Sequence, residues 1–366
     1  MISKIFTSEE LNQVQSLIAH ASQIVILSHM SPDGDAMGSS LGFRHWIKGC
    51  MPEKEVTNIV PNSFPSFLHW MPGAKDIVVY EQQSEEANRK MQEADLIICT
   101  DFNEPKRIGS VGTILVERIN AGTPCIVIDH HIVAAEKSIV HQTLAFVSPQ
   151  SPSASELVYR LIVACQETSN QRCPINLDAA TCLYTGMMTD TGNFSFNSNY
   201  AEMYEIIANL VRLGVNKDQC YNQTFNAYTA DRMRLMGYCL EKKMRIFPEY
   251  HLAFIYLSRR ELYRFNFQSG DAEGIVNLPL QIKDVYYSCF MREDKVSPSE
   301  VELAGGSKIK VKISMRSQGN RPVNTFCHDI FGGGGHMNAS GGEYYGSLTE
   351  AAQRFIESYS KYCKRD

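Results

Sequence analysis

The sequence predicts an α/β protein in which a mostly parallel sheet forms the first part and a smaller α/β part follows. Two observations support this prediction: short apolar runs recur through the first third of the chain, and helical patterns separate them. The chain has 366 residues, enough for two or three domains that each bury a core. A polar stretch over residues 216–231 is the predicted linker between a domain of residues 1–215 and one of residues 232–366.

The first domain is predicted to begin with an amphipathic helix over residues 8–22, with Ser8 as its expected N-cap. A β-branched run at residues 24–27 then leads through a Pro/Gly turn into a helical pattern at residues 36–48. Further strands are expected at residues 55–60, 77–80, 94–100 and 124–128, and further helices at residues 153–166, 177–188 and 201–213. Ser153 and Glu156 have the spacing of a capping box.

The second domain has a different pattern of predicted strands and helices. Strands are expected at residues 252–258, 285–292 and 308–316, followed by a helix at residues 322–331. A glycine-rich loop comes next, and a helix over residues 348–361 follows it.

The charge of the chain limits its partners. The formal net charge of −5 argues against a broad basic face, so long nucleic acid is not an expected partner. A small phosphorylated substrate, held by a few local cations and metal ions, remains compatible with this charge. The oligomeric state is not encoded in any pattern, and a homodimer stays open.

The cysteines and the apolar runs predict a location. The eleven cysteines include no CxxC pair, so we expect reduced, buried thiols and neither a disulfide framework nor a thiolate zinc site. The first twenty residues lack an apolar signal core, and no run approaches the ~18 apolar residues of a membrane span. The expectation is a cytoplasmic protein without a membrane partner.

Acidic and imidazole side chains gather where the predicted strands end. They are His29, Asp33 and Asp35 after the first strand, Asp101 after the fourth, Asp129, His130 and His131 after the fifth, and Asp190 after a helix and a Gly-containing turn. Each acid by itself is more often a helix cap or a turn residue. Because the carboxyl ends of parallel strands meet at one edge of a sheet, the joint occurrence predicts a shared site.

The chemistry of this set favours metal ions. Oxygen ligands mixed with imidazole, without thiolate, suit Mn²⁺ best and Mg²⁺ as an alternative. More than four ligands, four of them anionic, carry too much charge for one cation. Two divalent ions bridged by a carboxylate would balance it and generate a hydroxide nucleophile. Such a pair serves in-line displacement at phosphorus.

These motifs resemble the DHH phosphoesterase superfamily, and within it the bacterial oligoribonuclease/pAp-phosphatase (nanoRNase) type. The motifs on which this resemblance rests are His29-x-x-x-Asp33-x-Asp35, Asp101, Asp129-His130-His131 and Asp190-Thr191-Gly192. A late segment, Gly332-Gly333-Gly334-Gly335-His336, resembles the GGGH motif of the DHHA1 domain of that family. The resemblance implies a DHH domain with a mostly parallel sheet, a smaller DHHA1 domain with a mixed sheet, and an active-site cleft between them.

The resemblance also implies a role for each site residue. His29, Asp33 and Asp101 would hold one metal ion, and Asp35, Asp101, His130 and Asp190 the second, so that Asp101 bridges them. His131 would face the scissile phosphate as a charge stabiliser or proton donor. Asp129 would orient a histidine without binding metal itself. Spacing alone does not separate the roles of His130 and His131.

The second domain contributes the expected substrate-binding residues. Four glycines allow a backbone to approach a ligand closely, and their N–H groups suit an anion. In the resembled family, this glycine–histidine loop and an arginine at a strand end grip the nucleotide. Those positions are Gly333, Gly334, Gly335, His336 and Arg316, while Arg321, Asn338, Ser340, Tyr344 and Tyr345 are weaker candidates.

The leading functional hypothesis is a Mn²⁺-dependent phosphoesterase that hydrolyses short oligoribonucleotides or 3′-phosphoadenosine 5′-phosphate (pAp). A signalling phosphodiesterase acting on cyclic di-AMP or the linear dinucleotide pApA is the alternative, and nothing in the sequence separates the two. A RecJ-like exonuclease would need additional nucleic-acid-binding sequence, and a family-II pyrophosphatase would lack the GGGH loop. A non-catalytic nucleotide sensor on the same fold is the remote alternative.

Overall fold

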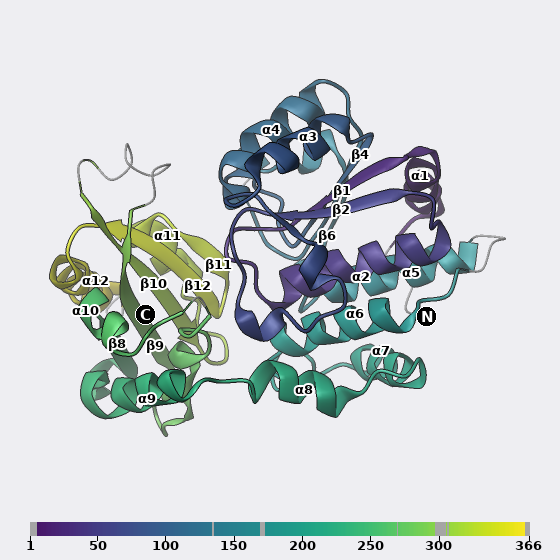
Figure 1. Cartoon of the computed structure of the whole chain (residues 1–366). Coiled ribbons are helices and arrows are strands. Elements are labelled where there is room, and N and C mark those ends of the chain that lie inside the picture. Colours follow the sequence, from purple (N-terminus) through teal and green to yellow (C-terminus); the bar gives the residue numbers. More distant parts are fainter. Residues whose placement is uncertain are drawn as a thin grey trace. The chain divides into compact units, whose positions relative to one another are not determined.

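The computed structural model describes residues 6–133, 135–168, 173–268, 270–296, 305 and 307–362 (Figure 1). The chain forms two compact units, Met1–Ala227 and Tyr228–Asp366. The division falls inside the stretch expected to be a linker, which contains helix α8 (Lys217–Phe225). Each unit is an α/β structure built on its own sheet, as the sequence predicts.

The sheet of the first unit is six-stranded and parallel, with the order β3-β2-β1-β4-β5-β6. Its strands are β1 (Gln23–Leu27), β2 (Glu55–Val60), β3 (Val78–Val79), β4 (Leu96–Thr100), β5 (Cys125–Asp129) and β6 (Leu144–Val147). The chain runs outward from β1 to β3 and then returns to β4 on the other side of β1. This reversal places a topological switch point between β1 and β4, where open sheets bind their ligands. Strand β6 is absent from the sequence prediction.

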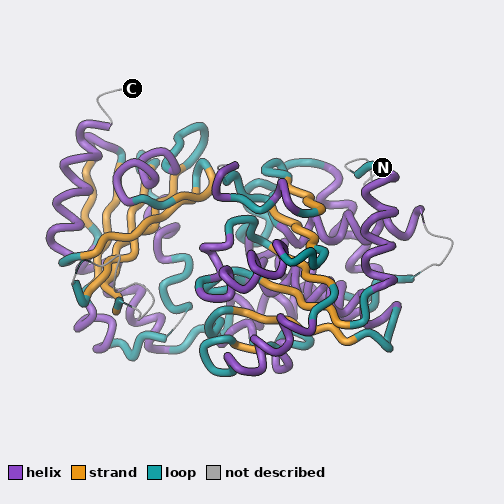
Figure 2. The backbone as a smooth tube through the Cα atoms, turned by 90° about the horizontal axis from the view of Figure 1, so that it is seen from above, coloured by secondary structure: helices purple, strands orange, loops and turns teal. Residues whose placement is uncertain are grey.

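Helices cover both faces of this sheet (Figures 1 and 2). One hydrophobic core joins it to α1, α2, α5, α6 and α7, and a second core joins it to α3 and α4. The bounds are α1 (Ser8–His20), α2 (Gly34–Cys50), α3 (Ser84–Glu93), α4 (Ser110–Asn120), α5 (Ala154–Thr168), α6 (Leu177–Asp190) and α7 (Ala201–Arg212). Because both faces are covered, β4 and β5 are buried along their whole length.

Two cap predictions need correction. Thr7, and not Ser8, caps α1, and it forms a reciprocal capping box with Glu10. Ser153 Oγ does accept the backbone N–H of Glu156 at 3.1 Å. The Glu156 carboxylate, however, accepts the Ser151 hydroxyl and pairs with Arg160, so it serves a buried network.

The sheet of the second unit is six-stranded and mixed, with the order β11-β12-β10-β9-β8-β7. Only the β8–β9 pair is parallel among the pairs between its described strands. The elements are α9 (Ala230–Tyr238), β7 (Arg245–Phe247), β8 (Leu252–Leu257), α10 (Arg259–Arg264), β9 (Tyr287–Lys295), β10 (Ile309–Ser317), α11 (Asn324–Phe331), β11 (Gly334–His336), β12 (Ala339–Tyr345) and α12 (Leu348–Tyr362). Phe326 and Phe355, from α11 and α12, pack on this sheet.

The glycine-rich segment is a strand of this sheet, whereas the sequence suggests a loop. A Cβ on Gly333 would lie 1.8 Å from the Gly341 carbonyl oxygen, and a Cβ on Gly335 would lie 2.5 Å from that of Ala339. The absence of side chains therefore lets β11 lie close to β12. Gly334 has open space around its Cβ position, so it is the glycine of this strand that a ligand can approach.

The expectation that all cysteines are reduced is wrong for one pair. Cys50, at the end of α2, forms a disulfide with Cys173, and the Cα atoms are 5.5 Å apart. These residues are 123 positions apart, which no sequence pattern relates. The other cysteines of the described part are buried thiols, as expected.

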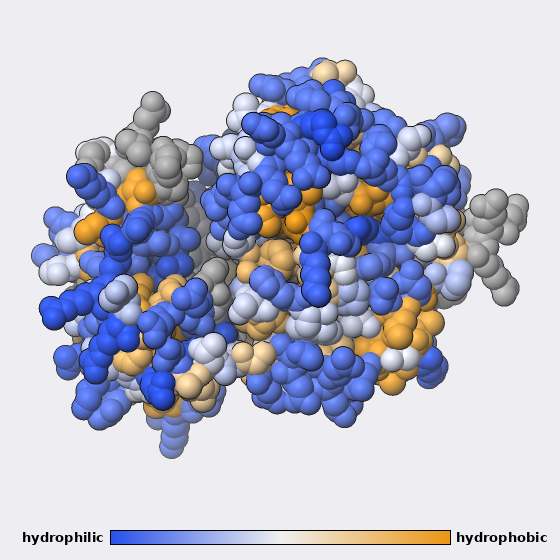
Figure 3. Space-filling view, in the orientation of Figure 1, coloured by the Kyte–Doolittle hydropathy of each residue, from blue (hydrophilic) through white to orange (hydrophobic). Residues whose placement is uncertain are grey.

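In the described residues, no helix has the length and apolar character needed to cross a bilayer. The face in Figure 3 is mostly hydrophilic, with small, separate apolar areas.

Candidate active site

The carboxyl ends of β1, β4 and β5 deliver the predicted residues to one edge of the parallel sheet. Asp101 follows β4 in a left-handed conformation (φ +64°), which turns the chain sharply at the switch point. Asp33 is the N-cap of α2, since its Oδ1 accepts the backbone N–H groups of Asp35 and Ala36. Asp190 is the last residue of α6, so it does not follow the helix as expected.

One group consists of His29, Asp33 and Asp101, whose ligand atoms all lie within 4.8 Å of one another. His29 Nε2 is 3.1 Å from Asp101 Oδ2 and 3.9 Å from Asp33 Oδ2. The other ring nitrogen, Nδ1, lies 2.9 Å from the Met30 carbonyl oxygen. This contact favours the tautomer with hydrogen on Nδ1 and directs Nε2 at the two carboxylates.

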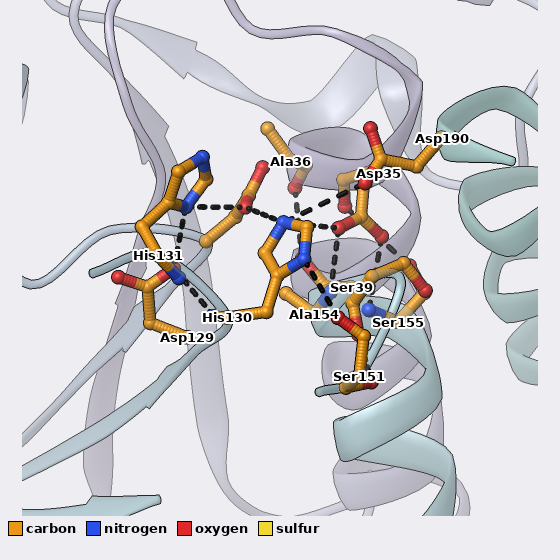
Figure 4. Close-up of polar contacts among 12 residues, drawn as sticks. Asp35, Ala36, Ser39, Asp129, His130, His131, Ser151, Ala154, Ser155 and Asp190 are labelled. Carbon is orange, nitrogen blue, oxygen red and sulfur yellow. Dashed lines mark hydrogen bonds and ion pairs between the residues drawn. The ribbon is translucent and has the colours of Figure 1, made fainter. Parts of the chain in front are cut away.

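A second group consists of Asp35, His130 and Asp190, again within 4.8 Å (Figure 4). His130 Nε2 is 3.5 Å from Asp190 Oδ2 and 3.8 Å from Asp35 Oδ2. Its Nδ1 lies 3.2 Å from the Ser151 carbonyl oxygen, which orients the ring as Met30 orients His29. Asp35 is held by the N-terminus of α5, because its carboxylate accepts the N–H groups of Ala154 and Ser155 at 2.6 and 2.9 Å.

Asp101 lies between the two groups. Its Oδ2 faces His29, and its Oδ1 lies 3.3 Å from His130 Nε2 and 3.5 Å from His131 Nδ1. Asp101 is 2% exposed, and its Oδ1 accepts no hydrogen bond within the described part of the chain. A buried carboxylate oxygen in this condition is costly without a cation.

Asp129 is fully buried and contacts His131. Its Oδ1 accepts from His131 Nδ1 at 2.8 Å and from the backbone N–H groups of His130 and His131 (Figure 4). Its Oδ2 accepts from Asn103 Nδ2 at 2.7 Å, and Asn103 Oδ1 accepts the Ser138 hydroxyl. Sequence reasoning missed Asn103, although its position two residues after Asp101 in the same strand-to-helix connection was a usable signal.

Glu156 is a second residue that sequence reasoning assigned only to a cap. It is 1% exposed and accepts the hydroxyls of Ser151 and Tyr200 at 2.8 and 2.7 Å. The buried Arg160 pairs with it. This network fixes the Ser151 turn, whose carbonyl oxygen orients His130.

When no metal ion is bound, the carboxylates of the site shift one another's pKa values. Burial, reinforced by the nearby Asp101 charge, raises the pKa of Asp35 to about 7. Burial raises the pKa of Asp190 well above its usual range, and the Asp35 charge adds to this effect. Burial opposes the charge of Asp101, but the neighbouring imidazoles of His130 and His29 hold its pKa well below the usual range. The pattern is that of an anionic cluster which takes up protons in place of cations.

Two predicted substrate-binding residues of the second unit, Arg316 and His336, lie at the same register of its sheet. Arg316 on β10 and His336 on β11 both pair with Ala339 of the intervening strand β12. Residues directly opposite in antiparallel strands point to the same face, so these two side chains lie on one face, about 10 Å apart across two strand spacings. Of the weaker candidates, Arg321 stacks on Tyr286. Asn338 Nδ2 donates to the Gly319 carbonyl oxygen, and the Ser340 hydroxyl donates to that of Gly334. Tyr344 faces the core.

The donor set fits divalent metal ions. Each group offers carboxylate oxygens with one imidazole and no thiolate, which suits Mn²⁺ or Mg²⁺ better than structural zinc. The Asp101 oxygen without a hydrogen-bond donor lies between the groups, where a bridging ligand belongs. The first unit therefore contains clustered acidic and imidazole groups that could hold metal ions.

A model of the DHH family, N-terminal domain, matches residues 23–187. The bifunctional oligoribonuclease and PAP phosphatase NrnA of Bacillus subtilis is 23% identical over 93% of this chain and 95% of that protein. The NrnA of Thermus thermophilus is 26% identical over 92% of this chain and 88% of that protein.

The cyclic-di-AMP phosphodiesterase GdpP of Bacillus subtilis is 25% identical over 95% of this chain but 49% of that protein. Among solved structures, an exopolyphosphatase-related protein from Bacteroides fragilis has 41% identity and a TM-score of 0.83. That match covers 98% of both chains.

Proposed function

Because the chain belongs to the DHH family of phosphoesterases, we propose that it is a two-metal hydrolase of short oligoribonucleotides and of pAp. The observation that carries this proposal is the placement of Asp101. Its two carboxylate oxygens face two separate ligand groups, which is the arrangement that two-metal phosphoryl transfer requires.

The proposed ligand sets follow the two groups. His29, Asp33 and Asp101 would hold one ion, and Asp35, Asp101, His130 and Asp190 the other, with Mn²⁺ as the expected metal. When bound, the two ions would supply Lewis acidity and lower the pKa of a water molecule that attacks phosphorus.

The protein's own residues would manage the proton and the charge. The Asp129 carboxylate holds the proton on His131 Nδ1, so exchange of a proton with the substrate falls to Nε2. Burial lowers the pKa of His131, and the Arg107 charge adds to this effect. A lowered pKa makes the protonated ring a stronger acid, which suits donation to a leaving oxygen.

The second unit would bind the nucleotide beside the scissile bond. Arg316 and His336 lie on one face of its sheet, and Gly334 leaves the backbone of β11 accessible to a ligand. An arginine fits a phosphate bidentately and keeps its charge. Selectivity among substrates would therefore come from this unit and not from the metal ligands.

A second candidate is a cyclic or linear dinucleotide phosphodiesterase. The similarity to GdpP over 95% of this chain supports it, since that relative is named for cyclic di-AMP. The geometry of the metal groups would serve either substrate equally well.

A substrate panel tests the proposal. We expect the purified protein with Mn²⁺ to release mononucleotides from pApA and orthophosphate from pAp, and a chelator to stop both reactions. Cyclic di-AMP and inorganic polyphosphate complete the panel, because relatives are named for these substrates or their hydrolysis. Turnover of cyclic di-AMP alone would favour the second candidate. Nucleotide binding without any turnover would support a non-catalytic nucleotide sensor.

A further inference from the structure

Arg107 lies in the connection that joins β4 to α4, within the 3-10 turn Pro105–Ile108. Its backbone carbonyl accepts the N–H of Met30 at 2.7 Å. Met30 follows His29 directly, so this hydrogen bond places Arg107 beside the end of β1, at the switch point of the sheet.

The connection is fixed from its other side as well. Asn103 donates to the Asp129 carboxylate at 2.7 Å and to the His131 carbonyl oxygen at 3.2 Å. Phe102 and Ile108 are fully buried and anchor the segment between these points. Arg107 is thus a partly buried residue on a turn that hydrogen bonds hold beside the segments following β1 and β5.

The charge of Arg107 acts on two imidazoles that belong to different strand ends. At His131, burial lowers the pKa and the Arg107 charge adds to this effect. At His29, burial and the Arg107 charge again act downward, although the neighbouring Asp101 carboxylate raises the pKa of this ring overall. The positive charge of Arg107 therefore acts on imidazoles at the ends of both β1 and β5.

The Arg107 guanidinium makes neither a hydrogen bond nor an ion pair with the residues that the structure describes. By contrast, Arg160 and Arg44 of the same unit each pair with a carboxylate. A cation in this condition, held beside a cluster of ligands, suits an anion that arrives from solution.

We propose that Arg107 binds the phosphate group of the substrate within the first unit, contacting its non-bridging oxygens next to His131. This inference rests on the proposed phosphoester substrate. It assigns the unit that holds the metal ligands a phosphate contact of its own, in addition to Arg316 in the second unit.

Arginine is the suitable residue for this task. Its planar guanidinium reaches two phosphate oxygens at once, remains charged at all relevant pH values, and binds more strongly as charge develops on the phosphate. Lysine at this position would keep the charge but lose the two-point geometry.

The test compares Arg107→Gln and Arg107→Lys with the matched control Lys106→Gln, which removes the neighbouring exposed cation of the same turn. The first readout is the affinity for inorganic phosphate, measured by calorimetry on the full chain loaded with Mg²⁺. We expect Arg107→Gln to weaken phosphate binding by about tenfold or more, Arg107→Lys to weaken it less, and Lys106→Gln to leave it unchanged.

The second readout is kcat/KM for pApA with Mn²⁺, which should fall by about 10²–10³-fold in Arg107→Gln. Equal phosphate affinities in Arg107→Gln and Lys106→Gln would overturn the proposal. An equal loss of Mn²⁺ and phosphate affinity in Arg107→Gln would also overturn it, because Arg107 would then act on the metal ligands. If the wild type binds phosphate through Arg107 but hydrolyses no nucleotide, the role of Arg107 stands and the proposed function fails.

Discussion

At the scale of single residues, several acids of the site have two tasks. Asp33 caps α2 with Oδ1 while Oδ2 faces His29, and Asp35 binds the N-terminus of α5 while it faces His130. A helix cap and a member of a ligand group look like alternative interpretations of Asp33 in the sequence, but one carboxylate serves as both. A carboxylate held by backbone N–H groups is oriented before any ligand arrives.

The position of Asp101 leads to a prediction about metal binding. Replacing Asp101 with Ala should remove activity at every Mn²⁺ concentration, because this one carboxylate faces both ligand groups. Calorimetry should show weakened binding of both ions. The control Asp76→Ala removes an acid that pairs with Arg44 away from the site and should change neither property. Substantial turnover by Asp101→Ala at high Mn²⁺ would contradict the bridging role.

The pKa shifts predict how the metal-free protein responds to pH. The pKa of Asp35 is raised to about 7, mainly by burial, and the pKa of Asp190 is shifted in the same direction. Between about pH 4 and 7 the folded state therefore holds protons that the unfolded chain has lost. In the presence of EDTA, the free energy of unfolding should therefore decrease as the pH rises through this window, by at most about 1.4 kcal/mol per pH unit for each such group.

Thermal unfolding between about pH 5 and 8 measures this slope. Asparagine at position 35 cannot titrate, so Asp35→Asn should flatten it. Added Mn²⁺ should raise the melting temperature more at high pH than at low pH, since bound ligands must be deprotonated. A melting temperature that rises with pH in EDTA would show that the carboxylates do not hold extra protons.

At the scale of elements, close helix packing supports the site. Small residues let α2 and α6 approach each other, since a Cβ on Gly38 would lie 2.7 Å from Gly186 Cα. A Cβ on Gly186 would lie 2.0 Å from Ser155 Oγ and 3.0 Å from Asp35 Oδ1. The glycine thus brings α6 against both the start of α5 and a predicted ligand.

Replacing Gly186 with Ala should therefore disturb the site by pushing α6 away from Ser155 and Asp35. We expect a loss of about 1–3 kcal/mol in stability from overpacking and a weaker affinity for Mn²⁺, measured by thermal unfolding and calorimetry. Gly237→Ala is the matched control, because it lies in helix α9 with no atom within 4 Å of its Cβ position. That variant should be neutral or slightly stabilising. Equal behaviour of the two variants would refute the packing argument.

At the scale of the whole molecule, the proposed function divides the chemistry between the two units. The first contains the candidate ligand groups, Arg107 and His131, and the second contains Arg316 and His336 on one sheet face. Each unit buries its own core, so we expect a change in the sheet of the second unit to leave the fold of the first unit intact.

This division predicts a selective effect of Arg316→Gln. The KM for pApA should rise by about tenfold, while turnover of the small diester bis(p-nitrophenyl) phosphate with Mn²⁺ stays near the wild-type rate. Arg354→Gln, which removes an exposed arginine of α12, serves as control. A parallel loss on both substrates would place Arg316 in the structure of the unit and not in nucleotide binding.

The sequence determined the fold class of this protein and indicated the acidic and imidazole residues that the structure brings together. Short apolar runs separated by helical patterns predict the parallel sheet. The spacing of apolar residues within each helix predicts which of its faces is buried, because both are local consequences of side-chain spacing. What the tertiary structure decided depends on contacts between distant residues. These include the strand order that puts the switch point between β1 and β4, the pairing of Cys50 with Cys173, the hydrogen bond of Asn103 to the His131 carbonyl, and that of Met30 to the Arg107 carbonyl. Such neighbours come from folding three strand ends to one edge, and no local pattern records them.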